Sequence, residues 1–173
     1  MLTALVAAFL LTAPVHAKDP CKGVSFEEDP FTHQKVATVP GAVWSISWIL
    51  GWEASYNAGE TAIKFKFPVS GVHDEVLPAG YTVKLLQEDG TVIDLVTTEP
   101  TQPAPGASSS GVYTTWLAVF PLNPELLSTL AAQPITAVRA TLPGGDVTWN
   151  AGGRYQKMFT KAFGCFASVS GTE

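Results

Sequence analysis

Apolar and polar residues alternate along several stretches of this chain, and such alternation is typical of β-strands with one buried face. The longest stretch runs from Ala42 to Tyr56, where every second residue from Trp44 onward is apolar or aromatic. We expect one long strand here. Because 15 residues would extend about 50 Å, Gly51 should mark a bulge or bend.

Shorter strands are expected at 34–39, 63–67 and 112–120, from the same alternation or from β-rich composition. Proline cannot donate a hydrogen bond to a neighbouring strand, so it should end a regular ladder. We therefore expect the strand at 34–39 to end at Pro40-Gly41 and the strand at 63–67 to end at Pro68.

A hairpin is predicted around the sequence Gln87-Glu88-Asp89-Gly90, which separates two β-rich runs at 81–86 and 91–96. Asp-Gly between such runs is the strongest short hairpin signal, because glycine adopts a positive φ without steric cost. A second hairpin is predicted from strands at 135–142 and 146–149 around Pro143-Gly144-Gly145.

Two segments have the pattern of helices. Asn123 followed by Pro124 and Glu125 is typical of a helix start, which predicts a helix over about 124–132. Apolar residues at helical spacing predict a second helix over 153–166. The expected fold class is α+β, mainly β, with an antiparallel sheet or sandwich and two helices.

Two loops are also expected. Pro100 to Gly111 is rich in proline, serine and glycine, so we expect a mobile loop. Gly71 to Gly80 should form a second loop, and it contains His73-Asp74-Glu75.

The first 17 residues have the pattern of a secretory signal peptide. Leu2 to Ala13 is almost entirely apolar, and Val15-His16-Ala17 has the small residues of a cleavage site. This run is shorter than the ~20 residues that a transmembrane helix needs. We expect cleavage after Ala17, export to the periplasm or beyond without a lipid anchor, and a single mature domain over 18–173.

Composition narrows the choice of partners. The chain has 46% hydrophobic and 14% charged residues, which favours a well-filled core over disorder. The net charge is −5, and the 10 lysines and arginines are scattered singly along the sequence. No basic patch is therefore expected that would bind nucleic acid or anionic lipid. We also expect no membrane span, no cofactor and a monomer.

Two cysteines, Cys21 and Cys165, lie near the two ends of the expected mature chain. Export would place them in an oxidising compartment, so we expect one disulfide between them. Closing a loop of that length would stabilise the fold by roughly 4 to 5 kcal/mol. A reactive cysteine is the disfavoured alternative, because the sequence has no Cys-x-x-Cys and no histidine nearby.

Trp44, Trp48 and Trp52 form a row on the expected long strand. An exposed row of tryptophans could bind a glycan or a partner protein. Packing in the core is the favoured alternative in a small β-domain, and the exposed row is kept as a candidate binding site. The same spacing would also place the three tryptophans on one face of a helix. This alternative is weaker, because Ile46 and Leu50 would then lie off the apolar face.

Motifs for catalysis or metal binding are weak. His73-Asp74-Glu75 offers metal-ligating side chains without a second spaced histidine, and the acidic run at 27–29 lacks the ordered spacing of a calcium loop, so no metal site is expected. Asp94 with Glu88 or Asp89 could supply an acid and base pair in principle. We assign no catalytic residue.

Several features resemble those of small secreted bacterial proteins of unknown function. They are Asp29-Pro30-Phe31-Thr32 before a strand, the strand and turn over 80–90, the run 122–130, Ile135 to Arg139, and a C-terminal helix with a cysteine. This resemblance implies no established activity. Arg139 is the polar residue that stands out in it, and a structural ion pair is favoured over a substrate clamp.

From these patterns we expect a secreted, non-enzymatic binding or interaction module. Its expected partner is a protein or a glycan. The alternative is a hydrolase that acts on glycan or peptide through carboxylates.

Overall fold

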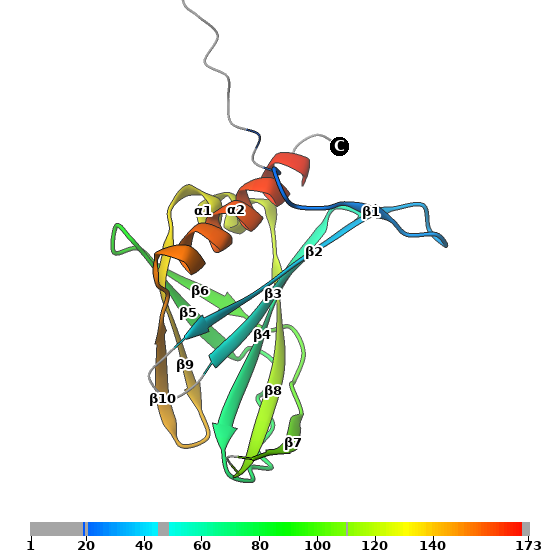
Figure 1. The fold of residues 1–173 in the computed structure, drawn as a ribbon. Helices are drawn as coiled ribbons and strands as arrows, with labels where there is room; N and C mark the ends of the chain where they lie inside the picture. The colour runs from blue at the N-terminus through cyan, green and yellow to red at the C-terminus, as the bar shows by residue number, and fades with distance from the viewer. Residues whose placement is uncertain (1–18, 20, 45–48, 110, 171–173) are drawn as a thin grey trace, which may run out of the picture.

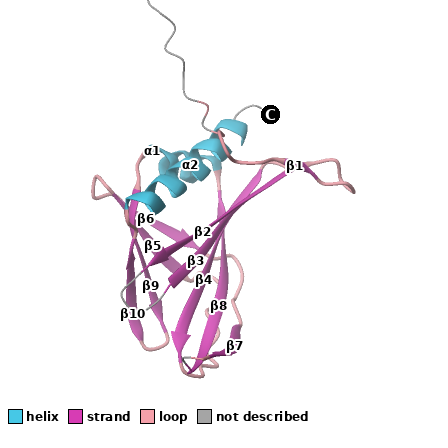
Figure 2. Ribbon diagram, in the orientation of Figure 1, coloured by secondary structure: helices cyan, strands magenta, loops and turns pink. Residues whose placement is uncertain are grey.

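Two antiparallel sheets face each other, and two helices lie together at one end of them (Figures 1 and 2). The structure is a computed structural model that describes residue 19 and residues 21–44, 49–109 and 111–170. One sheet has the strand order β1-β2-β3-β4-β8-β7, and the other has the order β10-β9-β5-β6. The predicted α+β, mainly β fold is confirmed in its sandwich form.

The strands are β1 (Glu27–Glu28), β2 (Lys35–Trp44), β3 (Ile49–Asn57), β4 (Glu60–Ser70), β5 (Thr82–Gln87), β6 (Val92–Val96), β7 (Pro103–Ser108), β8 (Gly111–Leu122), β9 (Ile135–Leu142) and β10 (Gly145–Asn150). The helices are α1 (Pro124–Ala132) and α2 (Gly153–Ser170). Strand β10 contacts β2 on one side of the sandwich, and β6 contacts β8 on the other.

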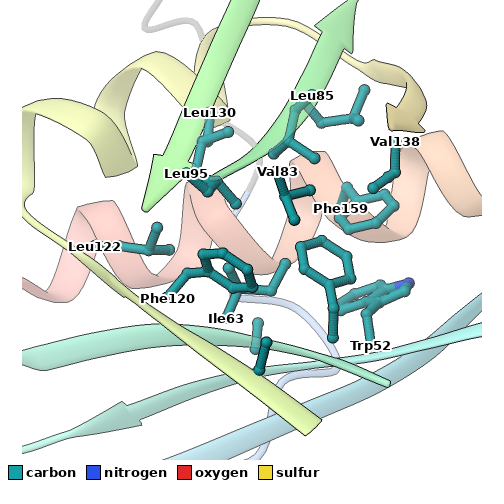
Figure 3. Packing of buried hydrophobic residues seen from close by; sticks show 14 of the residues in the cluster. Trp52, Ile63, Val83, Leu85, Leu95, Phe120, Leu122, Leu130, Val138 and Phe159 are labelled. Atoms are coloured by element: carbon teal, nitrogen blue, oxygen red, sulfur yellow. The ribbon is translucent and has the colours of Figure 1, made fainter. Parts of the chain in front are cut away.

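The hydrophobic core fills the space between the sheets. In Figure 3, Ile63 and Phe120 of the six-stranded sheet face Val83 and Leu95 of the four-stranded sheet. Phe159 of α2 is fully buried against the same cluster and closes the end of the sandwich. Each large apolar side chain buried in this way stabilises the fold by about 1.5 to 3 kcal/mol.

The expected single strand over 42–56 is wrong, because the chain reverses direction between Trp44 and Ile49. These two residues are cross-strand partners in the β2–β3 hairpin. Gly51 pairs regularly with Ala42 and Lys66, so it marks no bulge. The segment Ser45-Ile46-Ser47-Trp48 contains no Gly, Pro, Asn or Asp, so the sequence carries no turn signal at this point.

Several prolines lie inside strands. We expected Pro40 and Pro68 to end their strands, and we expected the proline-rich segment 100–111 to form a loop. Strand β2 continues through Pro40, strand β4 continues through Pro68, and the expected loop at 100–111 contains β7 with Pro103 and Pro105. Each proline lies where its strand has a neighbour on one side only. Strand β1 reaches only the first two residues of β2, β4 has lost β3 beyond Lys66, and β7 is an edge strand. A missing N–H has no cost on such a free side.

The other predicted elements are confirmed. In the β5–β6 hairpin, Gly90 has a φ of 89° and Thr91 N–H donates to Asp89 Oδ1 at 2.9 Å. Asn123 Oδ1 accepts a hydrogen bond from Leu126 N–H at 2.7 Å and so begins α1 as expected. Helix α2 extends to Ser170, beyond the predicted end at 166. No helix in the described part of the chain combines the length and apolar character of a membrane span.

Candidate functional site

The predicted tryptophan row is not an exposed surface at Trp52. This side chain is only 3% exposed, and its indole stacks on Phe159 of α2 with ring centroids 4.3 Å apart. For Trp52 the binding interpretation is therefore wrong and the packing alternative holds. Trp48 lies outside the described residues, as does the side chain of Trp44, so their part in binding stays a prediction.

The predicted disulfide between Cys21 and Cys165 is present. Cys165 is fully buried on α2, whereas Cys21 belongs to the arm that precedes β1. Cys21 O also accepts a hydrogen bond from Val24 N–H at 2.8 Å, which makes a compact turn. The bond therefore holds a folded turn of the arm against the helix.

A groove of about 940 Å³ lies beside this disulfide. Its walls are the arm, the outward face of α2, the β5–β6 turn, and the end of α1 with the segment that follows it. We call it the arm–helix groove; it is lined by Asp19, Lys22, Gly23, Glu88, Ala131, Pro134, Gly153, Gln156, Lys157, Thr160, Lys161 and Gly164.

Three lysines meet at the arm–helix groove. Lys157 and Lys161 are exposed and lie one turn apart on α2, about 6 Å along the helix axis. Lys22 lines the same groove from the arm, and Lys161 Nζ lies 3.0 Å from the position that a Cβ on Gly23 would occupy. None of the three forms an ion pair with a carboxylate in the described chain.

The net charge of the groove is opposite to that of the whole chain. Its three lysines outnumber its two carboxylates, Asp19 and Glu88, by one, while the chain as a whole carries −5. A negatively charged group would therefore be attracted to this groove.

Hydrogen bonds fix the wall that carries Glu88. The Gln87 side chain is 3% exposed, and its Nε2 donates to Thr129 O at 2.9 Å and to Gln133 O at 3.2 Å. Glu88 N–H donates to Pro134 O at 3.0 Å. These bonds join the β5–β6 turn to the last carbonyl groups of α1, which would otherwise lack partners.

The carboxylate pair considered from the sequence is not brought into one described cavity. Glu88 lines the arm–helix groove, whereas Asp94 forms an ion pair with Lys84 at 2.8 Å. Asp89 belongs to the hairpin turn, where hydrogen bonds from the backbone and side chain of Thr91 lower the pKa of its carboxyl.

The remaining candidates have structural partners. His73 Nε2 lies 2.9 Å from Ser70 O, and no group of three or more His, Cys, Asp or Glu in the described chain is placed to hold a metal. Arg139 donates to Thr148 Oγ1 at 3.0 Å, and the described residues give it no ion pair, so the favoured interpretation of an ion pair is wrong.

The buried phenol of Tyr81 is also structural. Burial, with a contribution from the charge of Asp146, raises the pKa of Tyr81 to about 12. Its hydroxyl donates to Thr141 O at 3.1 Å. A phenol that stays protonated and bonded in this way ties the residue before β5 to β9.

The cluster of Lys22, Lys157 and Lys161 was not predicted, because the basic residues are scattered singly along the sequence. A signal was present: Arg154, Lys157 and Lys161 recur at helical spacing in the predicted helix. Lys22 follows Cys21, and Lys161 lies one turn before Cys165. The predicted disulfide combined with the predicted helix would have placed these two lysines together.

No protein-family model matches the sequence, and comparisons with curated proteins and with solved structures give no match. The resemblance to small secreted bacterial proteins stays a prediction.

Proposed function

We propose that this protein is an exported, non-enzymatic binding module that holds an acidic segment of a partner protein in the arm–helix groove. The observation that carries the proposal is the convergence of Lys22, Lys157 and Lys161 on one groove without described ion-pair partners. The disulfide supports export, since disulfides form and persist in oxidising compartments.

The spacing of the lysines favours an extended peptide. Lys157 and Lys161 are separated by about 6 Å along α2. Acidic side chains two residues apart in an extended chain are separated by roughly 6.6 Å and lie on the same side. Such a peptide would place two carboxylates opposite the two helix lysines, and Lys22 would close over it from the arm.

The test is binding of a fluorescein-labelled peptide of alternating Glu and Ala, measured by fluorescence anisotropy. Reversing two charges with Lys157→Glu and Lys161→Glu should weaken binding by about tenfold or more. Lys35→Glu with Lys66→Glu is the matched control, because it changes the net charge equally on strands β2 and β4. The control should change binding by less than about twofold.

Equal losses in the two variants would mean that only net charge matters, and the groove would lose its assignment. Tighter binding of a polyuronate, with the same sensitivity to Lys157→Glu and Lys161→Glu, would assign the groove to an acidic glycan. That result would overturn the assignment to a peptide.

A further inference from the structure

A second pocket lies on the outer face of the six-stranded sheet, and it shares no lining residue with the arm–helix groove. Its volume is about 480 Å³, within the range of small-molecule sites. One wall is the connection from β6 to β7, residues 98–102, which we call the strap. The floor is formed by alternate residues of β8, from Thr115 to Pro121.

The strap is held in place by the backbone. Leu77 N–H donates to Thr101 O at 3.0 Å, and Thr101 N–H donates to Leu77 O at 2.8 Å. The pocket is therefore built by a bridge between two connecting segments, and a ligand would meet a wall that is already formed.

The Thr115 hydroxyl is the observation that points to a ligand. The residue is only 8% exposed, it lines the pocket, and its buried Oγ1 has no hydrogen-bond partner among the described residues. Its neighbour Thr114 is also buried, yet its Oγ1 donates to Gly71 O at 3.0 Å and accepts from His73 N–H at 2.9 Å. Buried hydroxyls normally have hydrogen-bond partners, as that of Thr114 does. The Thr115 hydroxyl lacks such a partner, and a ligand could supply it.

The other lining groups define the chemistry of that ligand. The strap adds the Glu99 carboxylate, the Gln102 amide and two threonine hydroxyls. On the floor, Leu117 is 52% exposed and Val119 is 44% exposed, which leaves an apolar patch beside these polar groups. A saccharide ring combines hydroxyl groups at its rim with an apolar C–H face, and it matches both features.

We propose that this strap pocket binds an uncharged saccharide. The C–H face of the sugar packs on Leu117 and Val119, Glu99 accepts hydrogen bonds from sugar hydroxyls, and Thr115 Oγ1 bonds a further hydroxyl at the floor. A cationic ligand is disfavoured, because Lys66 is the β4 partner of Leu117 and brings positive charge beside the pocket.

The decisive variant is Thr115→Val, which keeps the shape of the side chain and removes the hydroxyl. The hydroxyl has no partner in the part of the chain that the structure describes, so this variant should unfold at the same temperature as the wild type or higher. Saccharide binding should weaken by about fivefold or more. A merely structural threonine would not give loss of binding together with unchanged or raised stability.

Binding is followed by ¹H–¹⁵N NMR titration with cellotriose, maltotriose and chitotriose. We expect at least one of them to shift the amide signals of the strap and of residues 115–121. Thr38→Val, on exposed strand β2, is the matched control and should bind as the wild type does. Lys157→Glu with Lys161→Glu should also leave this binding unchanged, which separates it from the proposed peptide site.

Absence of shifts at the strap with all three sugars would overturn the proposal, as would sugar-induced shifts that Thr115→Val leaves unchanged. Spermidine is the competing probe. If it shifts the same signals more strongly than the sugars and Glu99→Gln abolishes the effect, the pocket is a cation site and the saccharide assignment is wrong.

Discussion

The position of one aromatic ring in the core depends on a missing Cβ atom. Gly41 of β2 and Trp52 of β3 are cross-strand partners, and the indole of Trp52 occupies the space that a Cβ on Gly41 would need. Gly106 and Tyr113 form a similar pair in the β7–β8 hairpin. In each pair the ring packs directly on the backbone of the neighbouring strand.

Gly41→Ala should therefore destabilise the fold. The new methyl group would overlap the indole of Trp52, which is already stacked on Phe159 and cannot move without disturbing α2. We expect the free energy of unfolding in urea to fall by about 1 to 3 kcal/mol, which is typical of overpacking.

Gly51→Ala is the control, because it lies on the adjoining strand. A Cβ there would meet Lys66 Cβ at 3.4 Å, an ordinary contact. Its free energy of unfolding should stay within about 0.5 kcal/mol of the wild type. If both variants lose the same stability, the loss at Gly41 comes from replacing a strand glycine. The overlap with the Trp52 indole is then not its cause.

Among the secondary-structure elements, the β5–β6 hairpin and helix α1 stabilise each other through Gln87. Its buried amide donates to two carbonyl groups near the end of α1, those of Thr129 and Gln133. Gln87→Leu would leave these acceptors without a partner. We expect a loss of about 1 to 3 kcal/mol in the free energy of unfolding, measured in urea by circular dichroism.

Gln133→Leu is the matched control, because the backbone carbonyl of Gln133 accepts the bond and its side chain is exposed. It should cost no more than about 0.5 kcal/mol. A loss as large as that of Gln87→Leu would show that the end of α1 is sensitive to any apolar substitution.

Elements with strong local signals were predictable from the sequence. The Asp89-Gly90 turn and the Asn123 cap act over a few residues, so their patterns can be recognised without knowing the fold. The prolines at Pro40 and Pro68 were misjudged for the opposite reason. Whether a strand has one neighbour or two at a proline is a property of the sheet, and the local sequence does not contain it.

The candidate sites were less predictable because each is assembled from distant segments. The arm–helix groove brings Lys22 beside Lys161 through the disulfide. The pocket under the strap is lined by Glu99 from the β6–β7 connection and by Thr115 from β8. Alternation along one strand predicted that Trp52 shares a face with other apolar residues, but it could not say whether that face is covered.

For the whole molecule, the disulfide joins the two ends of the described chain and also builds a wall of the arm–helix groove. Its cysteines are separated by 144 residues, so the bond restricts the unfolded chain over almost the entire domain. Replacing both with alanine should lower the free energy of unfolding by roughly 4 to 5 kcal/mol in the chain-entropy description. Denaturant unfolding of the wild type and the double variant without reductant measures this loss.

The same double variant should affect the two proposed sites differently. Without the bond, the turn that carries Lys22 is no longer held against α2, so binding of the alternating Glu and Ala peptide should weaken by about fivefold or more. Saccharide binding at the strap should persist in the folded fraction, because the strap is held by its backbone bridge to Leu77. If peptide affinity is unchanged in the folded double variant, Lys157 and Lys161 suffice and the arm is not part of the site.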